Sequence, residues 1–478
     1  MALLDDLAAL LGSQGCLVGS AVSEASRSDA SRAGRHLPLA LLRPATVEEV
    51  SRALALCHAA GQPVVPQGGM TGLAGGANPF GGDIALSLQR LNGIEEIDRD
   101  ASTMTLRAGT ILQVAQERAA EAGFLFPVDL GARGSCTVGG NIATNAGGLR
   151  VIRDGMTRDN LLGVEAVLAD GTILSNLGKV VKNNTGYDLR HLFAGSEGTL
   201  GVITRAVFRL RPLPRARATA LCALENYHSV LALLARSRTD LSGLSAFEAM
   251  WRDYFDMNQS LARLHLFDEA PAFSVILEAQ AETSEMETFL GAAFEDGVIA
   301  NALIAQTETE ARDFWTVREG HAMDAHLPNI INLDVSMPVA DLDDFAQSSR
   351  AEILSRFPGA HVSFFGHVGD SNLHVAVALQ GGAGDTDHTV DEIVYKLVRD
   401  FGGRFPPSMA SASSSARGLT TREAPPKSRR CGPSRRPWTR RGSSTRGRFC
   451  RLPVVWDAPD CSEWSGAAAS CRSFKSNS

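Results

Sequence analysis

The chain of 478 residues is too long for one ordinary domain and suits two or three. It is 44% hydrophobic and 21% charged with a net charge of −7, which is typical of a globular protein. The charge is unevenly distributed: residues 404–478 carry 15 Lys and Arg against 4 Asp and Glu, a net +11, and the first 403 residues carry 31 against 49, a net −18. A body this acidic argues against nucleic-acid binding by non-specific electrostatics.

The sequence also argues against a membrane or secreted protein. No run of 18 or more apolar residues occurs, and the first fifteen residues contain acids but no basic residue, unlike a secretory signal. The eight cysteines show neither a zinc-knuckle spacing nor a disulfide framework. We therefore expect a cytoplasmic protein.

The amino-terminal half alternates short strands, helices and glycine-rich loops. After a helical segment at 1–36, Thr46 and Glu49 have the spacing of a capping box and Gly61 supplies a stop, which predicts a helix between them. Short apolar runs predict strands at 63–66, 83–88, 103–106, 164–168, 172–174 and 202–209, with a further helix at 111–122. This pattern indicates an α+β domain over residues 37–214.

The pattern changes in the second half of the chain. Strands at 273–278 and 329–335 and helices at 341–356 and 390–401 predict a second, α/β domain over residues 215–403. Clusters of Pro, Ser and Arg without period follow Gly403, and this composition predicts disorder over the basic tail 404–478.

Three glycine-rich stretches suggest a ligand site in the first domain. In the first, 66–77, glycines can bring successive N–H groups near an anion, although neither a Walker loop nor a GxGxxG fingerprint is present and a loop of tight turns is equally compatible. The second, 129–148, and the third, 195–204, combine small residues with hydroxyls and amides. Three such stretches favour a large, partly polar ligand over packing alone.

Together the three stretches resemble the FAD-binding (PCMH-type) domain of the vanillyl-alcohol oxidase superfamily. Within it they are most similar to the D-2-hydroxyacid dehydrogenase family, which includes D-lactate dehydrogenase, glycolate oxidase subunits and D-2-hydroxyglutarate dehydrogenase. The resemblance spans about residues 37–403, and the run Val-Gly-Gly-Asn-Ile-Ala-Thr-Asn-Ala-Gly-Gly at 138–148 is its most specific motif. It implies a two-subdomain FAD-binding domain followed by a substrate domain, in an α+β protein.

The resemblance also implies the cofactor contacts. Some relatives attach FAD covalently through a His in or near the first loop, where this chain has Met70, so non-covalent FAD is expected. The FAD pyrophosphate is expected at Gly68, Gly69, Thr71 and Gly72, the flavin at Ser135, Thr137, Gly140, Asn141 and Thr144, and the adenosine side at Gly198, Gly201 and Ile203, with Pro66, Asp129, Gly139 and Asn145 completing the set.

The second domain contains candidate chemistry. His367 and His374 flank a glycine turn after an apolar strand, so they could converge on one metal ion or be an ordinary structural pair. Arg318 could clamp a carboxylate or pair with Glu319 or Asp313 on a helix surface. The resemblance implies that the two histidines bind a divalent metal, commonly zinc, and that Arg318 clamps the substrate carboxylate. Asn372 could also orient the substrate.

The implied reaction is the metal-assisted oxidation of a D-2-hydroxy acid to the 2-oxo acid, with hydride transfer to flavin N5. Asn332 and Ala376 stand where relatives often carry Lys and Asn, which favours a monoacid over D-2-hydroxyglutarate. We expect a quinone or an electron-transfer flavoprotein as acceptor and consider a homodimer. The alternatives are another superfamily oxidase or ether-lipid synthase, and a non-catalytic FAD-binding remnant.

The tail departs from the family after Gly403. The family motif Ser-Ala-Glu-His-Gly-Ile-Gly, whose Glu would complete the metal site and whose His is the expected base, is absent. With chosen codons, residues 405–412 read two bases later give that motif, and residues 441–450 give the expected Gly-Ile-Leu-Asn-Pro-Gly-Lys-Val-Leu. We hypothesise a frameshift near Gly403, to be tested by resequencing. The alternative is a genuine Arg-rich extension that contacts an anionic partner.

Overall fold

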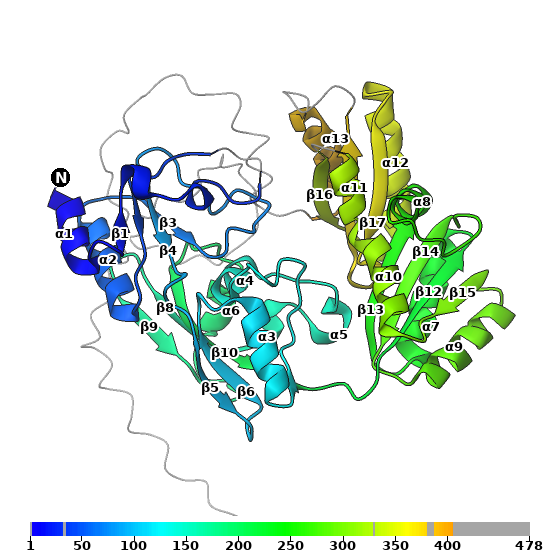
Figure 1. Cartoon of the computed structure of the whole chain (residues 1–478), viewed down its shortest axis with the longest axis horizontal. Helices are drawn as coiled ribbons and strands as arrows, with labels where there is room; N and C mark the ends of the chain where they lie inside the picture. The colour runs from blue at the N-terminus through cyan, green and yellow to red at the C-terminus, as the bar shows by residue number, and fades with distance from the viewer. Residues whose placement is uncertain (1, 32–34, 328–329, 380–386, 405–478) are drawn as a thin grey trace, which may run out of the picture.

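The computed structural model of the chain describes residues 2–31, 35–327, 330–379 and 387–404. The basic tail, apart from Arg404, and the motifs expected there lie outside the described residues. Figure 1 shows two parts side by side: an amino-terminal part, residues 2–212, and a carboxy-terminal part, residues 218–404, joined by one connecting stretch. Both parts mix helices and sheets, so the predicted α+β class is confirmed.

The amino-terminal part contains two main sheets. The four-stranded sheet consists of three parallel strands and one antiparallel strand at the edge, and the five-stranded sheet is antiparallel throughout. Their orders are β1 (Cys16–Leu17), β2 (Ala40–Leu42), β4 (Ile84–Ser87), β3 (Val64–Gln67), and β5 (Ile94–Asp98), β6 (Thr103–Arg107), β10 (Val202–Arg209), β8 (Leu161–Val167), β9 (Ile173–Asn176). A two-stranded pair joins β7 (Phe124–Leu125) to β11 (Arg211–Pro212).

Local sequence explains several of these elements. Helix α2 (Val47–Ala59) begins where the Thr46 hydroxyl accepts a hydrogen bond from the Glu49 N–H at 3.2 Å, as the capping pattern predicted. Strands β8 and β9 form a hairpin around the predicted turn, where Gly171 has a positive φ of 89°. In the amino-terminal segment the helix α1 covers only Ala2–Leu11, because Cys16–Leu17 pairs with β2 instead.

The remaining helices of this part are short and lie between strands. They are α3 (Leu112–Glu121), α4 (Val138–Thr144), α5 (Val151–Asp154) and α6 (Leu189–Phe193). Helix α5 lies between the two parts and packs against the carboxy-terminal part (Figure 1). Among the described residues of the whole chain, no helix combines the length and apolarity that crossing a membrane requires.

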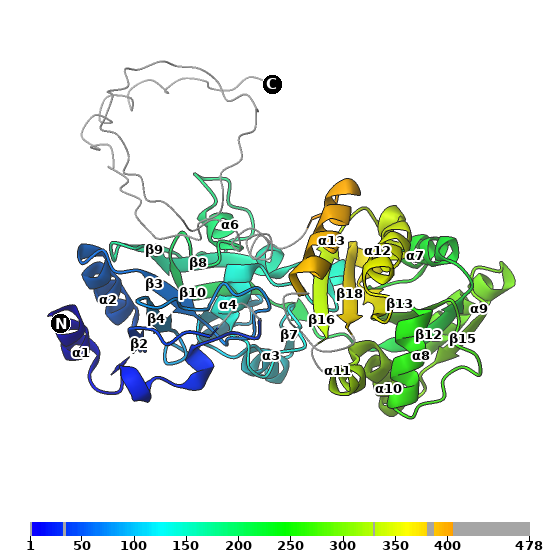
Figure 2. The ribbon, with the colours of Figure 1, turned by 90° about the horizontal axis from the view of Figure 1, so that it is seen from above.

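One seven-stranded antiparallel sheet organises the carboxy-terminal part. Its order is β15 (Asn301–Ile304), β12 (Ala218–Leu224), β14 (Phe273–Ala279), β13 (Leu244–Trp251), β17 (His361–Gly366), β18 (Asn372–Ala378), β16 (Ile331–Ser336). Helices cover both faces, as Figure 2 shows from above. The first face carries α7 (Tyr227–Asp240), α9 (Thr283–Glu295), α12 (Leu342–Arg356) and α13 (Asp387–Asp400), and the second carries α8 (Arg252–Leu261), α10 (Glu308–Glu319) and α11 (His321–His326).

The two faces differ in chemistry. The first face is apolar and packs the largest core of the part, including Phe247, Trp251 and Val375. The second face packs a smaller core and also carries ionisable side chains. Because directly paired residues of neighbouring strands point to the same side, the registers place Glu248, Glu278, Phe365, His374 and Asp334 on this second face. We call it the polar face of the sheet.

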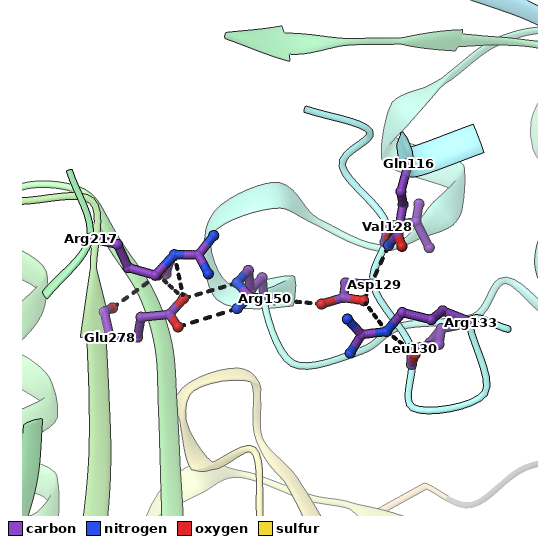
Figure 3. A network of polar contacts seen from close by, with 9 residues as sticks. Gln116, Val128, Asp129, Leu130, Arg133, Arg150, Arg217 and Glu278 are labelled. Carbon is purple, nitrogen blue, oxygen red and sulfur yellow. Dashed lines mark hydrogen bonds and ion pairs between the residues drawn. The ribbon is translucent and has the colours of Figure 1, made fainter. Parts of the chain in front are cut away.

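A buried ion-pair network joins the two parts (Figure 3). Nε and Nη2 of Arg150 donate to the two oxygens of Glu278 on β14, at 2.9 and 3.2 Å, and Nη1 donates to Oδ2 of Asp129 at 2.5 Å. Arg133 and Gln116 hold the other Asp129 oxygen, each at 3.1 Å. Beside this network lies a cavity of about 330 Å³, whose walls include Phe126, Gly148, Arg150 and Arg217.

Candidate active site

The three glycine-rich stretches lie against one another in the amino-terminal part. If Gly68 carried a side chain, its Cβ atom would lie 2.6 Å from Oγ1 of Thr137. A Cβ atom on Gly69 would lie 2.1 Å from the carbonyl oxygen of Ser135. A Cβ on Gly198 would lie 2.9 Å from the Pro66 ring. Since real Cβ atoms do not approach so closely, these positions require glycine, and the first stretch touches both of the others.

Hydrogen bonds complete the convergence. The backbone N–H groups of Gly195 and Glu197 donate to the carbonyls of Ile142 and Ala143 at 3.0 and 2.9 Å, which ties the third stretch to α4. Thr137 caps α4, its hydroxyl accepting from the Gly140 N–H at 3.3 Å. Segments more than 45 residues apart in sequence therefore surround one region, which is what a ligand of the size of FAD requires.

Two observations fit FAD to this region. Nδ2 of Asn141 and Oγ of Ser196 are buried, yet neither makes a hydrogen bond with any residue in the described part of the chain. Buried polar groups are nearly always hydrogen-bonded, so these atoms are suited to a polar ligand. The backbone also adopts the unusual left-handed conformation at Met70, Asn145 and Glu197, one in each stretch, and such conformations concentrate at binding sites.

The other predicted cofactor residues lie in the same stretches with varied surroundings. Thr144 donates to the Gly140 carbonyl at 3.0 Å, and Asn145 accepts from the Arg158 N–H at 3.0 Å. Asp129 is different, because both of its oxygens are used by the network between the two parts. The FAD contacts of all these residues stay predictions.

The polar face of the carboxy-terminal sheet brings Arg318, His367 and a glutamate together. Arg318 lies on α10, where it is only 5% exposed, so the alternative of a surface arginine paired with Glu319 or Asp313 is wrong. Its Nε and Nη2 both lie 2.7 Å from Oε2 of Glu248. The other oxygen of Glu248 lies 2.6 Å from Nδ1 of His367.

Aromatic rings hold the arginine and the second histidine. The guanidinium of Arg318 lies over the Phe365 ring, 4.6 Å from its centroid, a cation–π contact. Phe365 stacks on Tyr254 at 4.0 Å and also contacts the His374 ring at 4.9 Å. The Tyr254 hydroxyl donates to the Arg318 carbonyl at 2.8 Å. Arg318 is thus fixed by its side chain and by its backbone.

The two predicted histidines lie close together. Their ring centroids are 5.2 Å apart and the rings meet edge to face. Burial lowers the pKa of His374 well below its ordinary value, and the nearby positive charges of His367 and Arg318 lower it further, so His374 is unprotonated near neutral pH. An unprotonated imidazole can accept a hydrogen bond or bind a metal.

A metal site is not complete in the described part of the chain. Catalytic metal sites generally have three protein ligands, and no three His, Cys, Asp or Glu side chains converge among the described residues. His367 and His374 supply two nitrogen donors, and the expected third ligand belongs to the motif that the tail lacks. The metal role of the two histidines, and zinc as its identity, stay predictions.

Asn372 lies close to the two histidines, and so do the carboxyl groups of Asp334 and Asp370. Its Nδ2 donates to Oδ1 of Asp334 and to the Ser336 hydroxyl, and its Oδ1 is buried without a hydrogen-bond partner in the described part. Burial raises the pKa of Asp370 to about 6 and also raises that of Asp334. Asn372 therefore has an oxygen that remains available, as an orienting role requires, although that role stays a prediction.

Glu248 and Glu278 were not predicted from the sequence. Each is the only charged residue in a strongly apolar strand: Glu248 in Leu244–Trp251 and Glu278 in Phe273–Ala279. A charge in such a run must be paired when it is buried, so it was a signal of a polar network. The arginine partners could not have been identified from the sequence, since they lie 70 and 128 residues away.

Both parts of the chain match known protein families. The family described as FAD binding domain matches residues 38–176, and the family described as FAD linked oxidases, C-terminal domain, matches residues 213–406. A D-2-hydroxyglutarate dehydrogenase of Xanthomonas citri pv. viticola is 36% identical over 381 residues, which cover 78% of this chain and 80% of that protein. A Schizosaccharomyces pombe protein provisionally named a mitochondrial D-lactate dehydrogenase is 37% identical over 379 residues, 75% and 71% of the two chains.

Other relatives are longer than this chain. The chain spans 62% of the length of two rice proteins to which it is 38% identical, and 66% of a bovine protein named as a mitochondrial D-2-hydroxyglutarate dehydrogenase. Solved structures share the fold. An alkyldihydroxyacetonephosphate synthase superposes with a TM-score of 0.69 at 16% identity, over 84% of this chain and 81% of that one. A 4-ethylphenol oxidase from Gulosibacter chungangensis gives 0.67 at 16% identity, over 86% and 90%.

Proposed function

Because the chain belongs to the family of FAD-dependent D-2-hydroxyacid dehydrogenases, we propose that it oxidises a D-2-hydroxy acid to the corresponding 2-oxo acid. The observation that carries the proposal is the cluster of Arg318, Glu248, His367 and His374 on the polar face of the sheet. A buried guanidinium beside an unprotonated imidazole can bind a carboxylate and a neighbouring hydroxyl at once.

FAD is the proposed hydride acceptor, held without a covalent bond by the three glycine-rich stretches. Bound FAD would supply flavin N5 to receive the hydride from C2 of the substrate. The chain's own contribution there is a polar surface. Gly68 and Gly69 let the first stretch lie directly against the second, and the unpaired polar atoms of Asn141 and Ser196 can bind the cofactor.

The residues of the carboxy-terminal part would bind and orient the acid. Arg318 would bind the substrate carboxylate, because its guanidinium is fixed in place by Glu248 and by the Phe365 ring. His374 would accept a hydrogen bond from the substrate hydroxyl, which weakens the O–H bond as C2 loses hydride. The base expected to keep that proton belongs to the motif missing from the tail, so turnover by the chain as written is expected to be impaired.

We propose a 2-hydroxy monoacid as the substrate. Asn332 and Ala376 lie directly opposite each other on β16 and β18, two residues along from the pair Asp334 and His374. These neutral residues offer no cation for a second carboxylate at this place. D-Lactate is the simplest member of the proposed substrate class.

Several predictions from the sequence are still open. They are the electron acceptor, a quinone or an electron-transfer flavoprotein, and the homodimer. The third is the cytoplasm as the compartment, whereas some relatives are named as mitochondrial. The frameshift hypothesis falls outside the described residues.

Anaerobic titration of the FAD-containing protein tests the proposal. D-Lactate is expected to bleach the visible absorption of the flavin, and L-lactate is expected to leave it unchanged. Flavin that is indifferent to every D-2-hydroxy acid would favour the FAD-binding remnant instead, and a protein that binds no FAD would contradict both functions. The same titration on a frame-restored chain separates the function of the family from damage at the carboxyl end.

A further inference from the structure

Glu248 is a buried carboxylate to which the proposed reaction assigns no part. On β13 it directly precedes Ala249, which pairs with Gly366. Glu248 therefore lies beside His367, just after β17 ends. Its side chain is 1% exposed. An ionised carboxylate in such a place is strongly destabilising unless partners compensate for the water it has lost.

The two oxygens of Glu248 have different partners. Oε1 lies 2.6 Å from Nδ1 of His367, and Oε2 lies 2.7 Å from both Nε and Nη2 of Arg318. The two contacts give both oxygens of Glu248 a partner, as a buried carboxylate requires. The group is therefore a carboxylate that binds two functional side chains at once.

These contacts decide what each neighbour can offer to a ligand. Because Nδ1 of His367 is used by Glu248, Nε2 is the ring nitrogen left for another partner. Because Glu248 holds one edge of the Arg318 guanidinium and Phe365 lies beneath it, the guanidinium cannot rotate freely. A glutamate present only to neutralise Arg318 would not need the contact with His367.

We infer that Glu248 is a positioning residue of the substrate site, which holds the guanidinium of Arg318 and the imidazole of His367 in one fixed relation. A 2-hydroxy acid then meets both groups in a single orientation. Glu248 acts through these two side chains and touches no reacting atom. The inference rests on the proposed function, because it takes Arg318 as the partner of the substrate carboxylate.

Binding of oxalate to the full-length, FAD-containing protein tests the inference without requiring turnover. Glu248→Gln keeps the shape of the side chain but replaces one oxygen by an NH₂ group, which cannot accept from His367 or Arg318. We expect the dissociation constant for oxalate, followed through the visible absorption of the flavin, to rise about tenfold or more. Glu248→Asp keeps both oxygens and should restore part of the affinity.

Glu165→Gln is the matched control. Glu165 is also buried, and it pairs with Arg205 at 2.7 Å, but it lies on β8 in the amino-terminal part. Its loss should change the affinity for oxalate by no more than about twofold, because it contacts neither Arg318 nor His367.

The outcomes separate the inference from the proposed function. Unchanged affinity in Glu248→Gln, in a protein that binds FAD as the wild type does, would overturn the positioning role and leave the proposed function standing. Equal losses in Glu248→Gln and Glu165→Gln would also overturn it. A wild type that binds neither oxalate nor any D-2-hydroxy acid would defeat the proposed function and this inference together. If Glu248→Gln does not retain FAD, Glu248→Asp decides, and wild-type affinity in that variant overturns the inference.

Discussion

Two glutamates on the polar face of the carboxy-terminal sheet have similar surroundings but different partners. Glu248 on β13 and Glu278 on β14 are each 1% exposed, and each forms an ion pair with an arginine. The partners of Glu248 come from its own part of the chain. The principal partner of Glu278, Arg150, comes from the amino-terminal part and lies two residues after the second glycine-rich stretch.

The origin of the partner decides what each of these two buried ion pairs does. Around Glu248 the pair organises side chains that can bind a substrate. Around Glu278 the bidentate contact with Arg150 fixes the two parts relative to each other, and Asp129 extends it to the segment next to the predicted flavin (Figure 3). Removing either pair leaves a buried charge without a partner, but the first change should affect binding and the second should affect stability.

The largest effect is expected at Arg318. Arg318→Lys keeps the charge but loses the planar fork that binds a carboxylate through two N–H groups. We expect kcat/KM for a D-2-hydroxy acid to fall about 100-fold, or about 2.7 kcal/mol in transition-state stabilisation. Steady-state kinetics at equal FAD content measures it. Arg312→Lys is the control, since Arg312 is exposed on the same helix, and equal activity in the two variants would contradict the assignment.

The next largest effect is expected at Arg150. Arg150→Met leaves Glu278 and Asp129 without their shared partner, and the free energy of unfolding should fall by about 3 kcal/mol. Arg236→Met removes a more exposed pair with Asp296 and should cost at most about 1 kcal/mol. Urea unfolding compares the two. Equal losses would show that the Arg150 network does not stabilise the joint between the parts.

The pH dependence of stability tests whether Glu278 stabilises the joint between the two parts. Burial raises the pKa of Glu278, but the charge and hydrogen bonds of Arg150 outweigh it and hold the pKa below its ordinary value. A carboxyl group with a lowered folded-state pKa contributes stability above its unfolded value, near 4.5, and this contribution disappears as the pH falls below that value. Unfolding measured from pH 6 down to pH 3 should show a shallower decline in Glu278→Gln than in the wild type. Parallel curves would contradict the assignment.

The smallest effect is expected at the edge of the site. Asn332 is exposed and faces Ala376, so Asn332→Lys would add a cation in largely solvated surroundings. An exposed ion pair contributes up to about 1 kcal/mol, and the ratio of kcat/KM for D-2-hydroxyglutarate over D-lactate should rise by roughly fivefold. An unchanged ratio would show that the second carboxylate, if bound, lies elsewhere.

Local signals in the sequence predicted much of the fold. Strand β10 occupies the predicted residues 202–209, and α12 begins one residue after its predicted start at 341. The predicted glycine-rich stretches do converge, because close approach at Gly68, Gly69 and Gly198 leaves no room for a side chain. Alternating polarity and capping residues act over a few residues, so they can be read without the structure.

Pairings over long distances could not be predicted in the same way. Strands β12 and β13 were not identified, and β12 lies between β15 and β14 in the sheet, an order that no local pattern specifies. The alternative of Arg318 at a helix surface was compatible with its neighbours in sequence, since only tertiary packing brings Glu248 and Phe365 to it. Site geometry of this kind depends on strand order and register, which follow from the whole chain.

One measurement tests the central claim most directly: the yield of 2-oxo acid when the FAD-containing protein is mixed anaerobically with an excess of D-lactate. Hydride transfer to the flavin predicts one pyruvate for each flavin reduced, in a single turnover that stops without an electron acceptor. No pyruvate from a protein with a full complement of FAD, in both the chain as written and its frame-restored form, would contradict the proposed oxidation.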